Sequence, residues 1–531
     1  MQRKWWGSTI YKVISVLPQR YKSVYIYIFF IGLGIAFAIL THPFLRYPYD
    51  EFAHLIAIDE LYHGALTSTT SIPSGRLLWH QLWADIFHLF NIGSQQLFLR
   101  AHIIHTTQTL LALGAIYYFS HVVLRNIFKN IDKPTLLWLS VWSTVIWFTT
   151  FSTHSVHYSL VWNLWYSINY QITLPLFFYM VALTLVISLE NNSKMKNIFF
   201  ILQIITISLF TLKVHAMEFM YYLMYLAVLS LFYIDKLYTL FKKYYLLIIV
   251  AGLGLVYFIK NYQIESSRIF FYLHLDTLPS LYDKIILLGN KVLSHLNRAD
   301  SVVNEMMYLV LYLTLPFLLL VLWEKYQNKT NINLRLLFVI IGTSLFVLIP
   351  QYTFTAGLFA LIGRVDVVHR IYFASSLFIL LPLYIYYIGQ RYTLKLRYMN
   401  LMIFIILLSV AIFSKHTTVR SHNYYNNLHS ITESFNQKKL NFHLSPKNID
   451  DIGKKINQYE KENYSGKKIR FYARSDIAFV IKYMYHKEVY WKGRRVNPNY
   501  IKHYQEDKVS SNYEKVLFET PKMFPKYIPY W

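Results

Sequence analysis

Long apolar runs alternate along the chain with short polar connections. A helix needs roughly 20 consecutive apolar residues to cross about 30 Å of hydrocarbon, and a backbone in lipid must satisfy its own hydrogen bonds. The pattern therefore predicts an all-α polytopic membrane protein with about eleven transmembrane helices. The predicted spans are residues 24–41, 101–123, 135–151, 171–189, 197–212, 216–234, 245–260, 305–323, 336–350, 371–389 and 398–413.

Basic residues are distributed unevenly among the connections. Residues 1–23 carry Arg3, Lys4, Lys12, Arg20 and Lys22 and no acidic residue. Alternate connections are also basic, and their cations are Arg125, Lys129, Lys133, Lys194, Lys196, Lys236, Lys242, Lys243, Lys325, Lys329, Arg335, Arg391, Lys395 and Arg397. Short basic connections stay in the cytoplasm, so this alternation predicts a cytoplasmic N-terminus and an external C-terminus.

The tail, residues 414–531, has no run long enough to span a membrane and is rich in Lys, Asn, Tyr and Glu. We expect it to form a small α/β extracytoplasmic domain. The expected elements are a helix from Pro446 toward Tyr464, a strand at Lys468–Tyr472, a helix at Ser475–His486 and a strand at Glu488–Trp491. Its basic surface fits anionic lipid or glycan better than nucleic acid, and a merely soluble surface is an equal alternative.

Composition narrows the classes of protein that fit. The chain is 55% hydrophobic and 15% charged, with a net charge of +25 and no cysteine. Disordered chains, disulfide scaffolds and enzymes with a thiolate nucleophile are therefore excluded. The predicted domains are a cytoplasmic segment at 1–23, a transmembrane domain at 24–413 with a long external loop at 42–100, and the external domain at 414–531.

The external loop 42–100 holds two similar acidic clusters. Asp50-Glu51 and His54 follow the first span, and Asp59-Glu60 with His63 follow nine residues later. Pro48 disfavours helix just before Asp50, which is suited to cap a following helix. In one continuous helix the two pairs face opposite ways, so only one can line a given cavity. We favour Asp50 and Glu51 and interpret Asp59-Glu60 as a solvated face.

The two favoured acids are also candidate ligands for a divalent cation. Both clusters lack the first His of a zinc-protease motif. Loose ligation of magnesium, manganese or calcium by Asp50 and Glu51 with a distant partner remains open.

Other external connections supply cations and histidines. Lys213, His215 and Glu218 occupy a very short turn between two predicted spans. Arg364, His369 and Arg370 precede the tenth span, and an arginine there can hold phosphate oxygens with two parallel hydrogen bonds. Snorkelling to lipid headgroups is the alternative for the arginines.

Aromatic and histidine-rich segments complete the candidates. His154, His157 and Tyr170 lie in an external aromatic stretch that fits either an interfacial belt or a surface holding a sugar ring or a polyprenyl chain. His102 and His105 lie three residues apart in the second span, where polar packing competes with metal binding.

An acidic pair directly after the first span, an external cationic segment and about eleven spans with an external tail together make the chain resemble the GT-C superfamily of integral-membrane glycosyltransferases. The likeness covers most of residues 20–415. The resemblance implies transfer of a sugar from a polyprenyl-phosphate-linked donor to a glycan, lipid or protein acceptor, usually with inversion. It also implies a site on the periplasmic or exterior side of the cytoplasmic (inner) membrane.

The same resemblance implies roles for individual residues. Asp50 is expected to be the general base, with Glu51 as its partner or a ligand of magnesium or manganese. Further residues are expected to hold the donor phosphate or to support the site: Arg364, Arg370, His369, Lys213, His215, His54, Glu218, His154, His157 and Tyr170. The duplicated Asp-Glu pair departs from the family pattern and leaves the choice of base open.

Three other functions compete with this one. A polysaccharide polymerase or ligase with a lipid-diphosphate donor would rely on the external arginines and histidines. A transporter or flippase would carry charged pairs inside its spans, which are nearly free of acids here. A structural subunit of an envelope assembly complex would use the basic tail for docking.

Overall fold

The computed structural model describes the chain in stretches separated by gaps. The described residues are 25, 28–29, 31–33, 49–64, 77–93, 96–128, 130–147, 172–214, 217–261, 280–299, 315–327, 332–346, 349, 352–362, 371, 374–413, 446–462, 468–473, 475–483, 485, 487–490, 500–506 and 513–518. They fall into two compact units. The helical unit comprises residues 1–40 and 107–423, and the mixed unit comprises residues 41–106 and 424–531.

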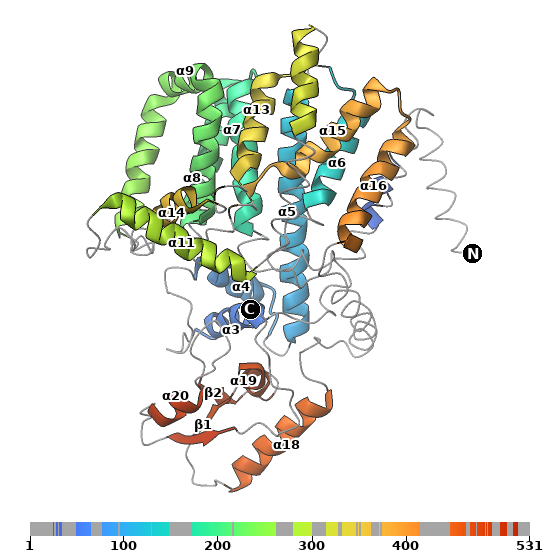
Figure 1. Cartoon of the computed structure of the whole chain (residues 1–531). Coiled ribbons are helices and arrows are strands. Elements are labelled where there is room, and N and C mark those ends of the chain that lie inside the picture. The colour runs from blue at the N-terminus through green and yellow to red at the C-terminus, as the bar shows by residue number, and fades with distance from the viewer. Residues whose placement is uncertain are drawn as a thin grey trace. The chain divides into compact units, whose positions relative to one another are not determined.

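The helical unit is built from long apolar helices (Figure 1). Its labelled helices are α5 (Leu97–Ile127, which begins in the mixed unit), α6 (Lys133–Ile146), α7 (Leu174–Leu189), α8 (Lys194–Val214), α9 (Met217–Asn261), α11 (Leu281–Ala299), α13 (Leu334–Ser344), α14 (Thr353–Ile362), α15 (Leu377–Arg391) and α16 (Leu396–Phe413). Residues 315–326 are helical as well. The prediction of a mostly helical chain is therefore confirmed.

Three helices of the described residues are long and apolar enough to cross a membrane. They cover Leu99–Ile127, Lys194–Val214 and Met217–Gly254. Apolar helices of intermediate length coincide with other predicted spans, among them Leu174–Leu189 and Leu334–Ser344. The count of eleven spans is not confirmed and stays a prediction.

Helix α9 differs from the predicted pattern of two spans and a connection. Its backbone leaves helical geometry at Tyr233 (φ −130°, ψ 30°) and at Tyr244 (φ −123°, ψ 19°). Figure 1 shows that α9 has two arms that turn back on one another. The predicted connection at 235–244 is therefore itself helical, and two local breaks reverse the chain direction in place of an irregular loop.

The interior of the helical unit combines aromatic packing with shared hydroxyl groups. The Phe119 and Phe178 rings lie 4.9 Å apart, and both also pack against Phe378. Tyr225 and Thr343 both bond to Ser376, at 3.4 Å and 3.1 Å. These hydrogen bonds join α9, α13 and α15, as is typical of helices packed where water is excluded.

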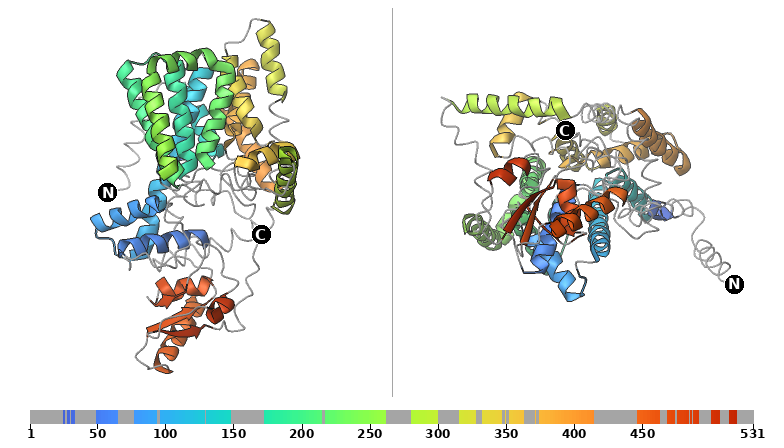
Figure 2. Two further views of the ribbon diagram at one scale, coloured as in Figure 1. Left: turned by 90° about the vertical axis from the view of Figure 1, so that its left-hand side faces the viewer. Right: turned by 90° about the horizontal axis from the view of Figure 1, so that it is seen from below.

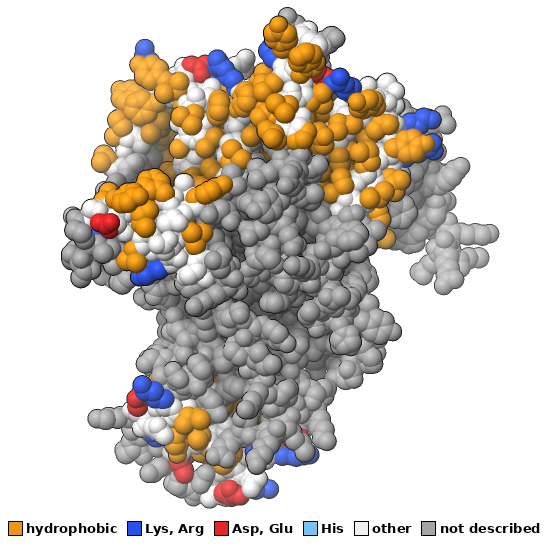
Figure 3. Space-filling view, viewed as in Figure 1, with side chains coloured by type: hydrophobic (Ala, Val, Ile, Leu, Met, Phe, Trp, Pro, Cys, Tyr) orange, Lys and Arg blue, Asp and Glu red, His pale blue; other side chains and the backbone are white. Residues whose placement is uncertain are grey.

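The outer surface of this unit is largely apolar. Figure 3 shows hydrophobic side chains over most of its described surface and Lys and Arg along one edge. Leu202 on α8 is 48% exposed, and Leu231 and Leu253 on α9 are 77% and 66% exposed. Lipid-facing helices present a surface of this kind. The helices therefore support the general conclusion that the chain associates with a membrane.

Ion pairs join the connections that the sequence predicts to be cytoplasmic. Each pair links two different connections, so these segments, far apart along the chain, lie together. The pairs are Arg125 with Glu190 (3.6 Å), Arg335 with Asp235 (3.5 Å) and Arg391 with Glu324 (3.0 Å).

Hydrogen bonds complete this arrangement. The backbone N–H of Asn333 donates to the Ile127 carbonyl at 2.7 Å, and its side chain accepts from the Tyr233 hydroxyl at 3.2 Å. Asn197 donates to the Tyr244 hydroxyl at 3.3 Å. The five basic connections therefore meet at one end of the helical unit.

The mixed unit contains the helices of the first external loop and the elements of the tail. Its labelled elements are α3 (Tyr49–Tyr62), α4 (Leu78–Leu89), the start of α5, α18 (Pro446–Glu462), β1 (Lys468–Tyr472), α19 (Ser475–Tyr483), β2 (Glu488–Val489), α20 (Tyr500–Glu506) and β3 (Tyr513–Leu517). The four tail elements predicted from sequence are confirmed as α18, β1, α19 and β2, with small differences at their ends. Helix α20 and strand β3 were not predicted.

The three strands form a parallel sheet in the order β2-β1-β3. The tail helices α18, α19 and α20 flank this sheet, as the views in Figure 2 show. Phe471 of the central strand is fully buried and contacts the rings of Tyr459 on α18 and Phe518 beyond β3. The tail thus has its own hydrophobic core, consistent with the predicted α/β fold.

Candidate functional site

Helix α3 carries both Asp-Glu pairs of the external loop. It begins at Tyr49, directly after Pro48, which disfavours helix in the residue before it. It ends before Gly64, whose φ of +68° is a conformation that glycine adopts without strain. Its residues Leu55, Ala57 and Ile58 are buried. As one continuous helix, α3 places its two Asp-Glu pairs half a turn apart, as the sequence predicts.

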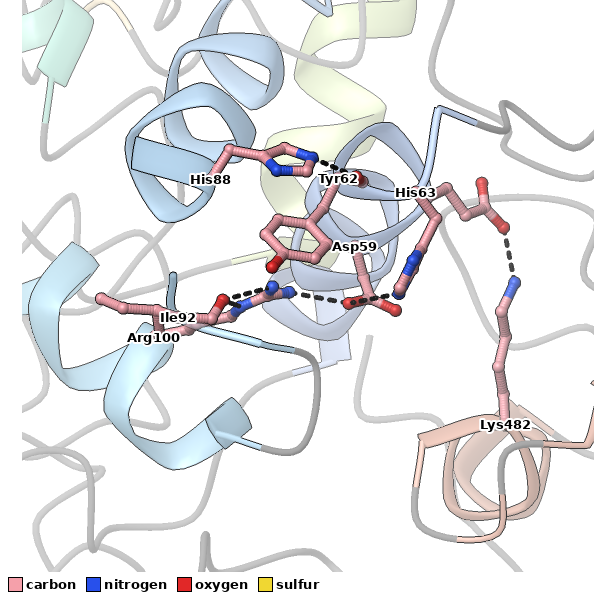
Figure 4. A network of polar contacts seen from close by, with 8 residues as sticks. Asp59, Tyr62, His63, His88, Ile92, Arg100 and Lys482 are labelled. Carbon is pink, nitrogen blue, oxygen red and sulfur yellow. Dashed lines mark hydrogen bonds and ion pairs between the residues drawn. The ribbon is translucent and has the colours of Figure 1, made fainter. Parts of the chain in front are cut away.

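Arg100 at the start of α5 anchors the second pair (Figure 4). Its Nη1 donates to Asp59 Oδ1 at 2.7 Å, and its Nε and Nη2 donate to the Ile92 carbonyl at 3.0 Å and 2.6 Å. The guanidinium carbon lies 4.3 Å from the centre of the Tyr62 ring and 5.1 Å from that of Phe87. The Arg100 side chain is only 1% exposed, so these contacts replace its hydration.

Glu60, the other member of the second pair, contacts the tail. Lys482 Nζ on α19 donates to Glu60 Oε1 at 2.5 Å. Glu60 is 7% exposed and Lys482 is 22% exposed. Both acids of this pair are therefore held by cations from other parts of the chain.

These contacts correct one prediction. The interpretation of Asp59-Glu60 as a solvated face is wrong, because Glu60 is buried and Asp59 is only 21% exposed. The sequence shows the helical spacing of the two acids but not their partners, which lie far away along the chain.

A histidine pair joins α3 to α4. His54 Nδ1 and His80 Nε2 lie 2.9 Å apart, and both rings are buried. The Trp79 ring meets the His54 ring edge to face at 5.9 Å. His54 was a predicted supporting residue, and it follows Asp50 by one helical turn on the same face of α3.

A second histidine contact lies near the end of α3. His88 Nε2 donates to the Tyr62 carbonyl at 2.5 Å, and the two rings stack at 4.0 Å. This contact fixes the α4 end against the last turn of α3 and supports Tyr62, the ring over which Arg100 lies.

Asp50 and Glu51 are the second and third residues of α3. The N-terminal turn of a helix carries the positive end of its dipole and unsatisfied N–H groups, so it favours carboxylates. Their side chains lie outside the described atoms. Their assignment as general base and partner, or as ligands of a divalent cation, stays a prediction.

The turn between α8 and α9 holds two more predicted residues. Lys213 lies in the last turn of α8 and Glu218 in the first turn of α9. Each charge matches the helix dipole at its position. Glu218 is 3% exposed, which shows that this acid is part of the packed interior and not of a solvated loop. His215, between the two, lies outside the described residues.

Several predicted site residues lie outside the described residues. They are Arg364, His369, Arg370, His154, His157 and Tyr170. His102 and His105 are described on α5, and His105 is buried at 3% exposure. Among the described residues, no group of three or more His, Asp or Glu side chains could hold a metal ion.

Sequence reasoning missed Arg100, His80 and Lys482. For Arg100 the sequence contains one indication. An arginine directly before an apolar span needs a hydrogen-bond acceptor when the helix is packed. His80 and Lys482 offered none, because their partners on α3 are 26 and 422 residues away.

No protein-family model matches the chain, and a search of curated proteins found no match.

Proposed function

We propose that the chain is a membrane glycosyltransferase that moves a sugar from a polyprenyl-phosphate-linked donor to an envelope glycan, lipid or protein at the external face of a membrane. The observation that carries the proposal is that the second Asp-Glu pair of α3 is bound in ion pairs, which favours the first pair for the chemistry. Asp59 and Glu60 are bound by Arg100 and Lys482. Asp50 and Glu51 begin the helix on its opposite side.

Asp50 is the general base of the proposed reaction. The acceptor hydroxyl oxygen attacks the anomeric carbon of the donor, its proton passes to the Asp50 carboxylate, and the bond between the anomeric carbon and the phosphate oxygen breaks. A positioned base of this kind contributes about 10²–10⁴-fold to rate. Glu51 orients the acceptor or holds a magnesium or manganese ion beside it.

The departing lipid phosphate gains negative charge and needs preorganised cations. Arg364, Arg370 and Lys213 supply them in this proposal, and His369 or His215 hydrogen-bonds the phosphate as it leaves. Support comes from Lys213, which lies at the end of α8 remote from Lys194. The 21 residues of α8 rise about 30 Å between these two ends, close to the thickness of a bilayer core.

The proposed orientation has separate support. The five basic connections meet at one end of the helical unit, as cytoplasmic connections must. Lys213 lies at the other end of α8, which fits an external phosphate-binding group. An external enzyme has no access to cytosolic nucleotide sugars, so a membrane-delivered donor suits this orientation.

Asp50→Asn tests the proposal, with Asp85→Asn as the matched control. Asp85 is an exposed acid on α4 of the mixed unit, and it accepts a hydrogen bond from Gln81, one helical turn before it. We expect Asp50→Asn to lower transfer from a polyprenyl-phosphate sugar by about 10²-fold or more, with normal membrane insertion. Asp85→Asn should keep its activity. Normal turnover in Asp50→Asn would remove the assignment.

Arg364→Ala tests the phosphate role. We expect its KM for the donor to rise more than its KM for the acceptor, because a guanidinium bound to phosphate acts on the donor alone. Unchanged donor dependence would contradict the role of Arg364 and leave that of Asp50 standing.

A further inference from the structure

Helices α11 and α14 of the helical unit cross at backbone contact. A Cβ added to Gly289 of α11 would overlap the Thr353 carbonyl, and one added to Gly357 of α14 would overlap the Ile285 carbonyl. Glycine at both sides of a crossing lets two backbones approach this closely, a pattern common among helices packed in membranes. We call α11 and α14 together the crossed helix pair.

The circumference of α11 is divided into three arcs. Ile285, Leu288 and Val292 are buried toward the crossing. Tyr282, Ile286 and Leu293 follow one another at helical spacing on a second side, where Tyr282 is 62% exposed. This second side is the apolar arc of α11.

The third side of α11, which we call the polar arc, is mostly polar, although Leu287 also lies on it at 36% exposure. Asp283, Asn290 and Ser294 lie on it, and all three are exposed. Lys284 and Lys291 lie at its border with the buried side. A helix with one apolar and one charged side of this kind suits the boundary between headgroups and acyl chains.

Helix α14 extends the apolar arc. It has no charged residue, and its 10 residues rise only about 15 Å, half the thickness of a bilayer core. Phe354 and Leu358 are 49% and 48% exposed on successive turns. The Phe354 ring lies 6.5 Å from the Tyr282 ring, so the exposed apolar side chains of the two helices form one surface.

We propose that the crossed helix pair is an interfacial membrane-binding element, with its apolar arc in the acyl chains and its polar arc at the headgroups. Its occupant is a lipid surface, because the pair belongs to a unit whose described surface is largely apolar, and Figure 3 shows hydrophobic side chains along α11 as well. A helix too short to span and too apolar for water has its place at this depth. The proposal does not depend on sugar transfer.

The absence of cysteine from the sequence allows a direct test in the full chain. Single substitutions Tyr282→Cys, Ile286→Cys and Leu293→Cys report the apolar arc, and Asp283→Cys, Asn290→Cys and Ser294→Cys are matched controls one to four residues away. Each variant is spin-labelled and reconstituted in phosphatidylcholine–phosphatidylglycerol vesicles. Relaxation by oxygen, which concentrates in lipid, is compared with relaxation by a water-soluble nickel chelate.

We expect a higher oxygen-to-nickel ratio at every apolar-arc position than at its polar-arc neighbour. Equal ratios on both arcs, or exclusion of both reagents from the apolar arc, would overturn the proposal. Gly289→Ala in the Tyr282→Cys background should lower the ratio by separating the helices. Gly252→Ala should not, because a Cβ there meets nothing within 4 Å.

Discussion

The two Asp-Glu pairs of α3 have the same dipeptide sequence and lie at different positions along the helix. Asp59 and Glu60 are bound by Arg100 and Lys482, with Glu60 only 7% exposed. Asp50 and Glu51 occupy the first turn of the same helix, where its dipole favours carboxylates. A short acidic motif therefore acquires its role from the partners that the fold brings to it. The second pair has a structural role, and the first pair stays the candidate for chemistry.

Removal of Arg100 should have the largest effect on stability. Arg100→Ala leaves Asp59 without its buried guanidinium partner and opens a space beneath Tyr62, so we expect a loss of about 3 kcal/mol in the free energy of unfolding. Thermal unfolding of the purified chain in detergent measures the change.

Arg397→Ala is the control for this variant. Arg397 also lies over an aromatic ring, that of Tyr398 at 4.7 Å, but it is exposed. Equal losses in the free energy of unfolding for the two variants would show that the burial of Arg100 adds no stability. The structural role assigned to Asp59 would then be contradicted.

The contact between Glu60 and Lys482 should have an intermediate effect. Lys482→Met leaves a buried carboxylate without this bond and should lower the free energy of unfolding by about 2 kcal/mol. Glu60→Gln with Lys482→Met should lose less than the sum of the single losses, since two residues in contact are coupled. Strict additivity in this double-mutant cycle would contradict the ion pair. Lys502→Met, in an exposed pair with Glu506, is the control.

An exposed ion pair provides the lower limit of the comparison. Asp235 and Arg335 lie 3.5 Å apart with side chains 56% and 62% exposed. Asp235→Asn should change the free energy of unfolding by less than about 1 kcal/mol, because water and salt screen the pair. A loss as large as that of Arg100→Ala would mean that the contribution of these ion pairs to stability does not depend on their burial.

The tail was predictable because its signals are local. Helix α18 begins at Pro446, a residue that suits the first turn of a helix, and the sequence of β1 alternates between polar and apolar residues. Helix α20 and strand β3 lack such strong signals, and β3 is recognisable mainly by its pairing with β1. Local patterns therefore gave the order of four elements but not the complete sheet.

The candidate site was less predictable because its contacts are distant in sequence. Helical periodicity predicts that Asp50 and Asp59 lie half a turn apart, and α3 is one continuous helix over both positions. Nothing local shows that Arg100 and Lys482 bind the second pair. Likewise, a search for spans finds runs of bilayer length, so it places the 10-residue α14 and the amphipathic α11 only in connections.

The central claim is that Asp50 serves the chemical step and Asp59 serves the fold. A single-turnover transfer assay on the full chain, presaturated with a polyprenyl-phosphate sugar donor, compares Asp50→Asn directly with Asp59→Asn. The account predicts a rate about 10²-fold or more lower in Asp50→Asn with the donor still bound, and a nearly unchanged rate per folded molecule in Asp59→Asn. The reverse pattern, with fast transfer in Asp50→Asn and none in folded Asp59→Asn, would contradict it.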